Sequence, residues 1–553
     1  MSKVTGARLV ADYFNKHNID TIFTLSGGHI SPIHNEIKDS GIYILDTRHE
    51  QAAVFGAEAY GRLRRKPGVA LVTAGPGFSN AITGIANAYM SQTPLVLIAG
   101  GVATTKRDRL DLQDMPQLPV IKPLVKGSWV VYNTERIPEY LDMAFRSAMA
   151  GAPGPVYLEI PIDILNKEID IPYTAPNSVV SQGCVDISGV DKLLDMINKA
   201  KKPVIIAGSG AWYSDASSEL QSLADKWGVP VFTIGMARGM ISDDHPLCFE
   251  SALAIRPGAA GHAFTNTDLV IILGTRMNLY FMFGYIFNQD AKIAQVDIDP
   301  GEIGRNKSVD LALAGDIKAY ISTLNEKANL LPDKERFRPW VDELRRVDTD
   351  MKTSYQGLWC SKDTPIHPLR LCKEVTDYIG PDDILVGDGG DTQIWMGMTV
   401  RLLREGRYMD SGLFGCLSVG LPFANSAKAM YPDKRVFLIS GDGSIGFNFM
   451  EFQTAIRHKL PIVVIVSNDI GWGMIRHSQK LKFGAPISAV TELGMVNYHL
   501  LVKDLGGYGE LVEHPDEILP ALDRAIASGL PSLINVVTDP DIISPGSEAL
   551  AMV

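Results

Sequence analysis

Short apolar runs that close on glycine or aspartate recur along the whole chain, and they constrain the fold more than any other feature. Continuous β-branched runs of this length are typical of strands buried on both faces of a sheet. Patterns typical of helices separate the runs, and this alternation predicts parallel α/β sheets. The runs occupy 21–28, 68–77, 94–101, 203–210, 268–275, 292–299, 383–390, 435–443, 461–469 and 531–539.

Two polar connections divide these runs into three groups. Residues 166–183 are rich in Pro, Ser and Asn, and residues 331–365 are charged with a partly helical pattern. At roughly 150 residues a domain, a chain of 553 residues is expected to hold three or four domains. We predict an α/β protein with three doubly wound parallel-sheet domains, at 1–170, 186–330 and 360–553.

Composition excludes several classes of protein. The formal net charge is −11. Proteins that bind nucleic acid usually carry an excess of basic residues that pair with the phosphates, so this class is excluded. The five cysteines, Cys184 among them, show no CxxC spacing, which excludes a zinc ribbon and fits a reducing compartment. No apolar run approaches the ~20 residues that span a bilayer, and the N-terminus does not read as a signal peptide. We therefore expect a cytoplasmic protein with no nucleic-acid or membrane partner.

The strongest local signal is Gly-Asp-Gly-Ser at 441–444. Asp442 follows one predicted strand and Asp469 follows the next, one strand–helix–strand crossover later. Both carboxylates are therefore expected at the same edge of a parallel sheet, where hard oxygen ligands suit Mg²⁺. The glycines let the backbone approach a diphosphate. Taken alone, an ordinary strand-end turn explains the motif equally well.

Three further segments have both a chemical and a structural interpretation. Glu50 opens an apparent helix, where it could simply be a surface cap. Residues 74–90 form a Gly-rich turn that feeds a helix, which alone is weak evidence for an anion or cofactor site. His29 follows the first predicted strand, where it could relay protons, although a structural histidine is the commoner outcome.

Together these segments resemble the thiamine diphosphate (ThDP) enzymes of the acetolactate synthase superfamily, over nearly the whole chain. Benzaldehyde lyase and the acetolactate-synthase-like 2-hydroxyacyl-CoA lyases are the most similar members. The agreement of several motifs in order favours the cofactor interpretation of Glu50 and of Gly-Asp-Gly-Ser. The matching stretches are LSGGHISPI, DTRHEQAAVFGAEAYGR, VTAGPGFSNAITGIANAY, LQDMPQ, PGPVYLEIPIDIL, GDGS and EFQTAIRHKLPIVVIVSNDIGW.

The resemblance implies a cofactor role for several residues. Glu50 would hydrogen-bond the aminopyrimidine of a neighbouring subunit's ThDP and favour the tautomer that removes the thiazolium proton. Leu417 would wedge the cofactor into a bent shape, and the Gly415 carbonyl would accept from its exocyclic amine. The residues implied at the diphosphate are Thr392, Gln393, Gly443, Ser444 and Ile445.

The implied metal site departs from the family pattern at one position. Asp442, Asp469 and the Gly471 carbonyl would hold Mg²⁺, but many family members carry two amides where this chain has Asn468-Asp469. Aspartate remains a good magnesium ligand and adds negative charge. We expect metal binding to survive, with a stronger dependence on pH and on metal identity.

On the substrate side the resemblance implies His29 and Gln113 as catalytic partners of Glu50, which would handle the substrate's hydroxyl and carbonyl groups. Trp472 and Met474 would line the pocket. Met474 is larger than the residue found there in benzaldehyde lyase, so it would narrow one wall.

The central segment leaves a nucleotide site open. Residues 235–246 and 274–284 resemble 2-hydroxyacyl-CoA and oxalyl-CoA enzymes, whose central domain holds an adenine nucleotide. Gly208 and Arg276 would then contact ADP or CoA, although a nucleotide fold with nothing bound explains them as well. FAD is not expected, because the Asp-Asp pair typical of FAD-binding members is missing after Arg276.

The resemblance implies a carbon–carbon lyase or carboligase that acts on 2-hydroxy ketones or 2-hydroxyacyl-CoA thioesters through a ThDP-bound carbanion. The alternative is acetolactate synthase, which joins two pyruvates after one loses CO₂. We expect a homodimer or homotetramer with active sites between subunits. A degenerate binding protein is less favoured because Glu50 and Asp442 are intact. A nicotinamide oxidoreductase is less favoured still, because residues 203–212 lack the full GxGxxG pattern.

Overall fold

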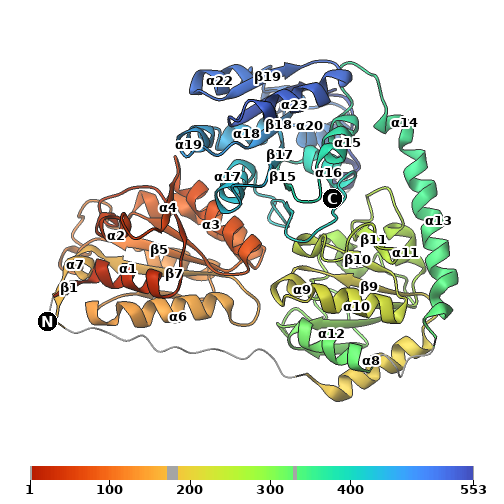
Figure 1. Cartoon of the computed structure of the whole chain (residues 1–553), viewed down its shortest axis with the longest axis horizontal. Coiled ribbons are helices and arrows are strands. Elements are labelled where there is room, and N and C mark those ends of the chain that lie inside the picture. Colours follow the sequence, from red (N-terminus) through yellow and green to blue (C-terminus); the bar gives the residue numbers. More distant parts are fainter. Residues whose placement is uncertain (1–2, 171–184, 328–332, 552–553) are drawn as a thin grey trace.

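The computed structural model describes residues 3–170, 185–327 and 333–551. Most of the connection predicted at 166–183, together with Cys184, lies outside the described residues. Three six-stranded sheets, each entirely parallel, dominate the described part of the chain. Helices flank each sheet, which confirms the predicted α/β class with three doubly wound domains (Figure 1).

The N-terminal domain has the strand order β3-β2-β4-β5-β7-β6. Its middle strands are fully buried because helices cover both faces of the sheet, which explains their continuous apolar runs. The strands are β2 (Thr21–Thr24), β3 (Tyr43–Asp46), β4 (Gly68–Val72), β5 (Leu95–Gly101), β6 (Ser128–Val130) and β7 (Pro155–Pro161). The helices are α1 (Gly6–Lys16), α2 (Ser31–Ile37), α3 (Glu50–Arg64), α4 (Pro76–Met90), α5 (Gln117–Ile121), α6 (Ile137–Met149) and α7 (Ile162–Asn166). A short antiparallel pair, β1 (Val4–Thr5) with β8 (Glu168–Ile169), lies beside this sheet.

The central domain has the order β11-β10-β9-β12-β13-β14. Its strands are β9 (Pro203–Ala207), β10 (Val231–Thr233), β11 (Cys248–Ser251), β12 (Leu269–Leu273), β13 (Lys292–Asp297) and β14 (Leu311–Ala314). Its helices are α8 (Ile187–Lys199), α9 (Ser209–Tyr213), α10 (Ser217–Trp227), α11 (Ala260–Asn266) and α12 (Ile317–Glu326).

The C-terminal domain has the order β16-β15-β17-β18-β20-β19. Its strands are β15 (Ile384–Gly387), β16 (Tyr408–Met409), β17 (Val436–Gly441), β18 (Val463–Asn468), β19 (Tyr508–Val512) and β20 (Ser532–Val537). Its helices are α15 (Pro368–Tyr378), α16 (Asp391–Gly397), α17 (Gly420–Met430), α18 (Asp442–Phe447), α19 (Glu451–Arg457), α20 (Gly473–Phe483), α21 (Ser488–Thr491), α22 (Tyr498–Leu505), α23 (Ile518–Ala527) and α24 (Pro545–Ala551).

Short helical segments and one longer helix cover most of the connection predicted at 331–365, which packs on the central domain and is not a solvated linker. Helix α13 (Arg338–Ser354) runs along the central domain toward the C-terminal domain, and the short α14 (Gln356–Trp359) follows it (Figure 1). Trp340 and Leu344 are buried in the central core, and Trp340 donates to the Pro203 carbonyl at 3.1 Å. The charges that suggested a linker occupy the outer face of an amphipathic helix.

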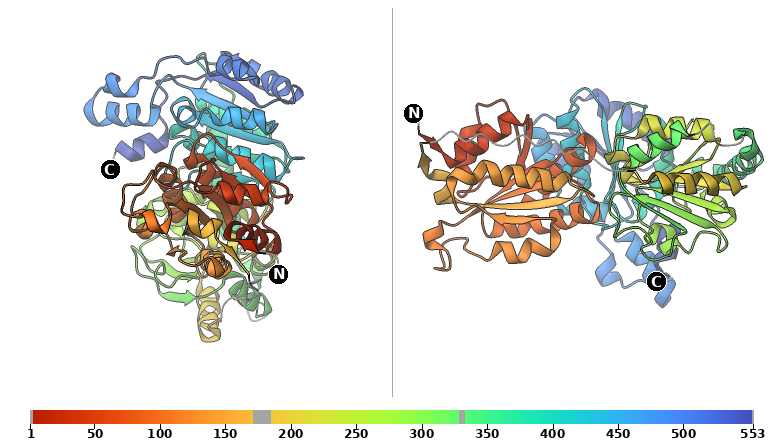
Figure 2. Two further views of the ribbon diagram at one scale, coloured as in Figure 1. Left: turned by 90° about the vertical axis from the view of Figure 1, so that its left-hand side faces the viewer. Right: turned by 90° about the horizontal axis from the view of Figure 1, so that it is seen from below.

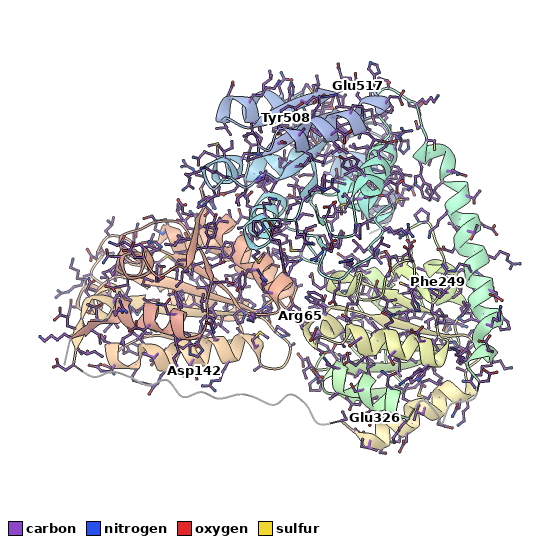
Figure 3. All side chains as sticks on the ribbon, in the orientation of Figure 1. Arg65, Asp142, Phe249, Glu326, Tyr508 and Glu517 are labelled. Atoms are coloured by element: carbon purple, nitrogen blue, oxygen red, sulfur yellow. The ribbon has the colours of Figure 1, made fainter. Side chains whose placement is uncertain are left out.

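The C-terminal domain lies against both other domains (Figures 1 and 2). It meets the N-terminal domain through α17 and α3, where Ser426 donates to the Gly56 carbonyl at 2.8 Å. Arg65 stands where the domains come together (Figure 3). Its guanidinium stacks on Trp212 of the central domain and pairs with Glu405 of the C-terminal domain.

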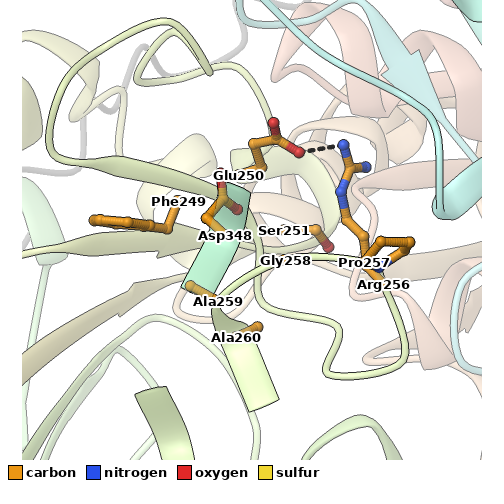
Figure 4. A pocket seen from close by; sticks show the side chains of 9 residues that line it. All are labelled: Phe249, Glu250, Ser251, Arg256, Pro257, Gly258, Ala259, Ala260 and Asp348. Atoms are coloured by element: carbon orange, nitrogen blue, oxygen red, sulfur yellow. Dashed lines mark hydrogen bonds and ion pairs between the residues drawn. The ribbon is translucent and has the colours of Figure 1, made fainter. Parts of the chain in front are cut away.

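The central domain holds the segment after α16 through buried arginine–carboxylate pairs. Asp243 pairs with Arg238 at 2.8 Å and accepts from the Leu402 amide at 2.7 Å. Arg256 pairs with Glu250, and Figure 4 shows the two side chains facing each other. Arg256 also donates to the Gly397 carbonyl at 2.9 Å, at the end of α16. The last residues of α16 are thereby tied to the central domain.

Candidate active site

Asp442 and Asp469 emerge at one edge of the C-terminal sheet. They follow β17 and β18, which are neighbouring parallel strands. Both carboxyl groups are largely buried, and they share a hydrogen bond. Burial and the neighbouring carboxylate raise the pKa of Asp442 well above its usual range, and burial also raises the pKa of Asp469. Two adjoining buried carboxyl groups do not readily ionise together, because their negative charges repel each other. A cation bound between them would offset this repulsion.

The donor chemistry of this pair fits Mg²⁺, which prefers hard oxygen ligands. Neighbouring groups orient both carboxylates: the Gly471 amide donates to Asp442, and Arg476 donates to Asp469 at 2.8 Å. Across the described part of the chain, no group of three or more His, Cys, Asp or Glu side chains could hold a metal. An ion at this edge would therefore complete its coordination with backbone, water or phosphate oxygens.

Glycines let the loops around the two aspartates approach closely. Gly389 has a φ of +104°, and a Cβ there would lie 3.2 Å from the backbone nitrogen of Gly441. A Cβ on Gly443 would lie 2.7 Å from the Trp472 ring. Any larger residue at these two positions would push the loops apart. The spacing of the Gly-Asp-Gly segment is thus set by packing between loops.

The remaining predicted residues of the C-terminal domain lie on segments that follow its strands. Thr392 and Gln393 occupy the first turn of α16, and Gln393 accepts from Ser411 at 2.9 Å. Gly415, with a φ of +66°, is exposed, whereas Leu417 is half-buried. Four more residues stand at the starts of α18 and α20: Ser444 and Ile445, which are buried, and Trp472 and Met474, which are half-buried.

Glu50 is a buried carboxylate, so its interpretation as a surface cap is wrong. It stands at the first position of α3 and is 6% exposed. Asn80 of α4 donates to its Oε2 at 2.9 Å. Its Oε1 lies 3.3 Å from the place that a Cβ on Gly77 would occupy. The helix start supplies a favourable dipole, and Asn80 supplies one hydrogen bond to the carboxylate.

Thr73 links His29 to Gln113, a link that sequence reasoning missed. The Thr73 hydroxyl donates to Gln113 Oε1 at 3.3 Å and lies 3.2 Å from His29 Nδ1. With that hydroxyl proton directed at Gln113, a neutral His29 would donate from Nδ1 and keep Nε2 as an acceptor. Thr73 and Glu50 both flank Gly77, so the four side chains form one neighbourhood.

Gln113 has an unusual backbone conformation. Its φ is +68°, in the left-handed region that few residues other than glycine adopt. A Cβ on Gly75 would lie 2.8 Å from the Gln113 Cβ, so these two positions are closely packed. Strain of this kind persists where surrounding contacts over-determine a conformation, and it is enriched at functional sites. The sequence carried one available signal for this packing, namely the Gly-rich turn at 74–77.

The structure therefore places the residues predicted for ThDP, metal and substrate in two groups, one in the N-terminal domain and one in the C-terminal domain. Glu50, His29 and Gln113 lie in the N-terminal domain, and the predicted metal and diphosphate residues lie in the C-terminal domain. Within the described ranges, no hydrogen bond or ion pair joins one group to the other. The two domains are linked two residues before Glu50, where the Arg48 backbone amide donates to Glu451 Oε1 at 2.9 Å.

The two predicted nucleotide contacts are packed against other protein groups. A Cβ on Gly208 would lie 2.3 Å from the Thr275 side chain, so the backbone there is closely covered. Arg276 donates to the Met90 carbonyl of the N-terminal domain, and burial lowers its pKa. Arg276 thus has a structural partner between domains. Among the described helices, none has the length and apolar character needed to cross a bilayer.

Three domain families match the chain, all from thiamine pyrophosphate enzymes. The N-terminal TPP binding domain matches residues 4–120, and the central domain matches residues 190–324. The C-terminal TPP binding domain matches residues 388–536. Glu50, His29 and Gln113 fall within the first match, and Asp442 and Asp469 fall within the third.

Full-length relatives carry two different names. A probable acetolactate synthase of Mycobacterium bovis is 32% identical, over 98% of this chain and 97% of its own length. The 2-hydroxyacyl-CoA lyase 2 of Caenorhabditis elegans is 33% identical, over 97% of this chain and 90% of its own. The 2-hydroxyacyl-CoA lyase 2 of Homo sapiens is 31% identical, over 99% of this chain and 92% of its own.

Proposed function

The chain belongs to the thiamine diphosphate-dependent enzymes of the acetolactate synthase superfamily, and on this premise we propose that it is a carbon–carbon lyase or carboligase. Its substrates are 2-hydroxy ketones or 2-hydroxyacyl-CoA thioesters. The observation that carries this proposal is the linked set of His29, Thr73 and Gln113 beside the buried Glu50. Such a set can hold a substrate carbonyl and move a proton at an adjacent hydroxyl.

We assign the cofactor's diphosphate and its Mg²⁺ to the C-terminal domain. Asp442, Asp469 and the Gly471 carbonyl would hold the metal, because the two carboxyl groups are paired and buried. When bound, ThDP supplies a carbon nucleophile and an electron sink for cleavage of the carbon–carbon bond. The residues assigned to the rest of the cofactor are Thr392, Gln393, Gly443, Ser444 and Ile445 at the diphosphate, and Gly415 and Leu417 at the rings.

We assign Glu50 to the cofactor's pyrimidine, where its carboxyl group would hold a proton in a hydrogen bond. Asn80 occupies Oε2, so we assign Oε1 to the cofactor. Burial excludes water from this carboxylate and strengthens any hydrogen bond that it makes. Asn80 acts as a positioning residue, because it holds the carboxylate in one orientation.

His29 and Gln113 are the groups that we assign to the substrate. With Nδ1 engaged at Thr73, His29 presents Nε2 as a proton acceptor, and the Gln113 amide nitrogen is a donor for a carbonyl oxygen. Trp472 and Met474, at the start of α20, would form a wall that limits the size of the substrate.

A second copy of the chain would complete the site. Among the described residues, no hydrogen bond or ion pair joins the two groups within one chain, and the C-terminal domain exposes large apolar side chains on α18 and α20, two helices that carry residues of its own group. Phe447 is 62% exposed and Phe483 is 68% exposed. Exposed apolar surface of this kind marks an interaction site. We therefore propose a homodimer, or a homotetramer built from two dimers, with Glu50 of one subunit facing Asp442 of the other.

Acetolactate synthase is the second candidate, favoured by the full-length similarity to the Mycobacterium bovis relative. An ADP or CoA site at Gly208 and Arg276 has weaker support, because Arg276 already bonds to Met90.

Product analysis separates these candidates. The purified protein, with ThDP and Mg²⁺, is given a 2-hydroxyacyl-CoA, a 2-hydroxy ketone or pyruvate in parallel, and products are identified by mass spectrometry. Formyl-CoA with an aldehyde, or two aldehydes from the ketone, would support the lyase. Acetolactate from pyruvate, with the other substrates untouched, would support the second candidate. A protein that binds ThDP and converts none of the three would refute both.

A further inference from the structure

Asp388 is a buried carboxylate that none of the assigned roles uses. It directly follows β15 and is 1% exposed. Its Oδ1 accepts from the Ser444 hydroxyl at 2.6 Å and from the Ser418 amide at 3.0 Å. Its Oδ2 accepts from the Gly420 amide at 3.1 Å. The backbone N–H of Gly389 also donates to this carboxylate.

The donors come from three segments that are distant in the sequence. Gly389 begins the loop that leads to Thr392 and Gln393. Ser418 and Gly420 follow Leu417 and open α17, and Ser444 lies in the first turn of α18. Each of these segments carries residues that we assign to the cofactor. One carboxylate therefore joins all three segments.

The contacts around Asp388 continue into a second layer of bonds. Ser418 has a φ of +66°, and its hydroxyl accepts from the backbone N–H of Asn448 at 2.9 Å. The Ser444 hydroxyl also accepts from the Ser418 amide, at 2.9 Å. The Ser444 side chain thus points into the protein, so only its backbone amide is left to face a diphosphate. These bonds fix the spacing between α18 and the start of α17.

A carboxylate is the side chain that suits this position. Every group directed at Asp388 is a donor, and an ionised carboxylate accepts at both oxygens. An asparagine of the same shape would present its own N–H₂ group to one of these donors. That mismatch leaves buried donors unpaired, which costs much more than the bond itself. Burial raises the pKa of Asp388, and the hydrogen bonds from its donors oppose that shift because they favour the ionised carboxylate.

We propose that Asp388 is a positioning residue for ThDP, one that sets the spacing of the three segments that bind the cofactor. This inference rests on the proposed function. Asp388 does not touch the cofactor; it acts through the backbone of Gly389, Ser418 and Gly420 and through Ser444.

The test is the affinity for ThDP, measured by calorimetry on the full-length protein with saturating Mg²⁺. Asp388→Asn should bind ThDP roughly tenfold more weakly or worse. At saturating ThDP it should keep its turnover within about threefold, because no reacting group has been removed. The matched control is Asp383→Asn. Asp383 accepts from Arg435 and from the Gly380 amide at 2.8 Å, at the opposite end of β15. It should bind ThDP like the wild type.

The outcomes are distinguishable. If the wild type does not bind ThDP, the proposed function fails and this inference falls with it. If the wild type binds and Asp388→Asn binds equally well, the inference alone is overturned. Equal weakening in Asp383→Asn would also overturn it, because the effect would be a general loss of stability. Should Asp388→Asn not fold, Ser444→Ala decides the matter: it keeps the backbone amide and loses one bond to Asp388, and unchanged affinity would contradict the proposal.

Discussion

Asn80 donates a hydrogen bond of 2.9 Å to Oε2 of Glu50, and this contact fixes the orientation of a buried carboxylate. The two residues come from different helices, α3 and α4, whose N-terminal ends lie next to each other. The Gly-rich turn before α4 brings Thr73 to the same place, together with His29 and Gln113. The N-terminal domain thus presents one organised polar group, and single substitutions in it test turnover and cofactor binding separately.

Substitution of Glu50 by glutamine should abolish turnover without abolishing cofactor binding. Glu50→Gln keeps the shape and the bond from Asn80 but removes the charge, so turnover should fall at least about 100-fold. Calorimetry should show an affinity for ThDP within about threefold of the wild type. Glu36→Gln, on α2, is the control and should leave both quantities unchanged. Full activity in Glu50→Gln would be incompatible with its assigned role.

Removal of divalent metal should remove ThDP binding. After treatment with EDTA the wild type should bind ThDP weakly, and added Mg²⁺ should restore the affinity. Asp442→Ala should not recover at Mg²⁺ concentrations that saturate the wild type, because it loses a metal ligand. Asp469→Asn should recover, because an amide oxygen also coordinates Mg²⁺. Metal-independent binding of ThDP would rule out the assigned metal site.

Loss of the Thr73 hydroxyl should weaken the handling of substrate. Thr73→Val keeps the shape but leaves His29 and Gln113 without their shared partner, so kcat/KM should fall roughly tenfold. Affinity for ThDP should not change, because the hydrogen bonds of the Thr73 hydroxyl are to His29 and Gln113, the groups that we assign to the substrate. Thr376→Val, at another buried threonine, controls for the substitution itself and should keep full activity. Equal kcat/KM values in Thr73→Val and the wild type would show that the link has no catalytic consequence.

The burial of Glu451, beside the N-terminal domain, should make stability depend on pH. Burial raises the pKa of Glu451 to about 7, although Arg48 and Arg457 oppose the shift. Because the folded protein holds this proton more tightly than the unfolded chain, the stabilisation is complete below about pH 4.5 and is lost as pH rises through 7. A shift of this size corresponds to roughly 3 kcal/mol.

Glu451→Gln keeps the uncharged state at every pH, so its melting temperature relative to the wild type should rise between pH 5 and pH 8. The amide oxygen can still accept from the Arg48 amide. Scanning fluorimetry at several pH values measures this difference. A difference that does not change with pH would exclude Glu451 as the titrating group.

The amino-acid sequence by itself determined the three parallel sheets and the edge at which Asp442 and Asp469 meet. A strand buried on both faces must be apolar at nearly every position. The continuous apolar run from 436 to 441 therefore predicts a buried strand. Likewise, one crossover between β17 and β18 is enough to bring the residues that follow them to the same edge. Both properties are local, or depend on neighbouring elements only.

Tertiary structure alone decided the burial of Glu50, the link at Thr73, the hydrogen bonds of Asp388 and the packing of α13. The local sequence around a glutamate at a helix start does not predict whether its side chain faces water or, as Glu50 does, another side chain such as Asn80. Thr73 and Asp388 find their partners on segments far away along the chain, and those partners are set by how whole helices and loops pack. A side chain's own neighbours in the sequence cannot specify such contacts, because hydrogen bonds between distant loops exist only after the domains have assembled.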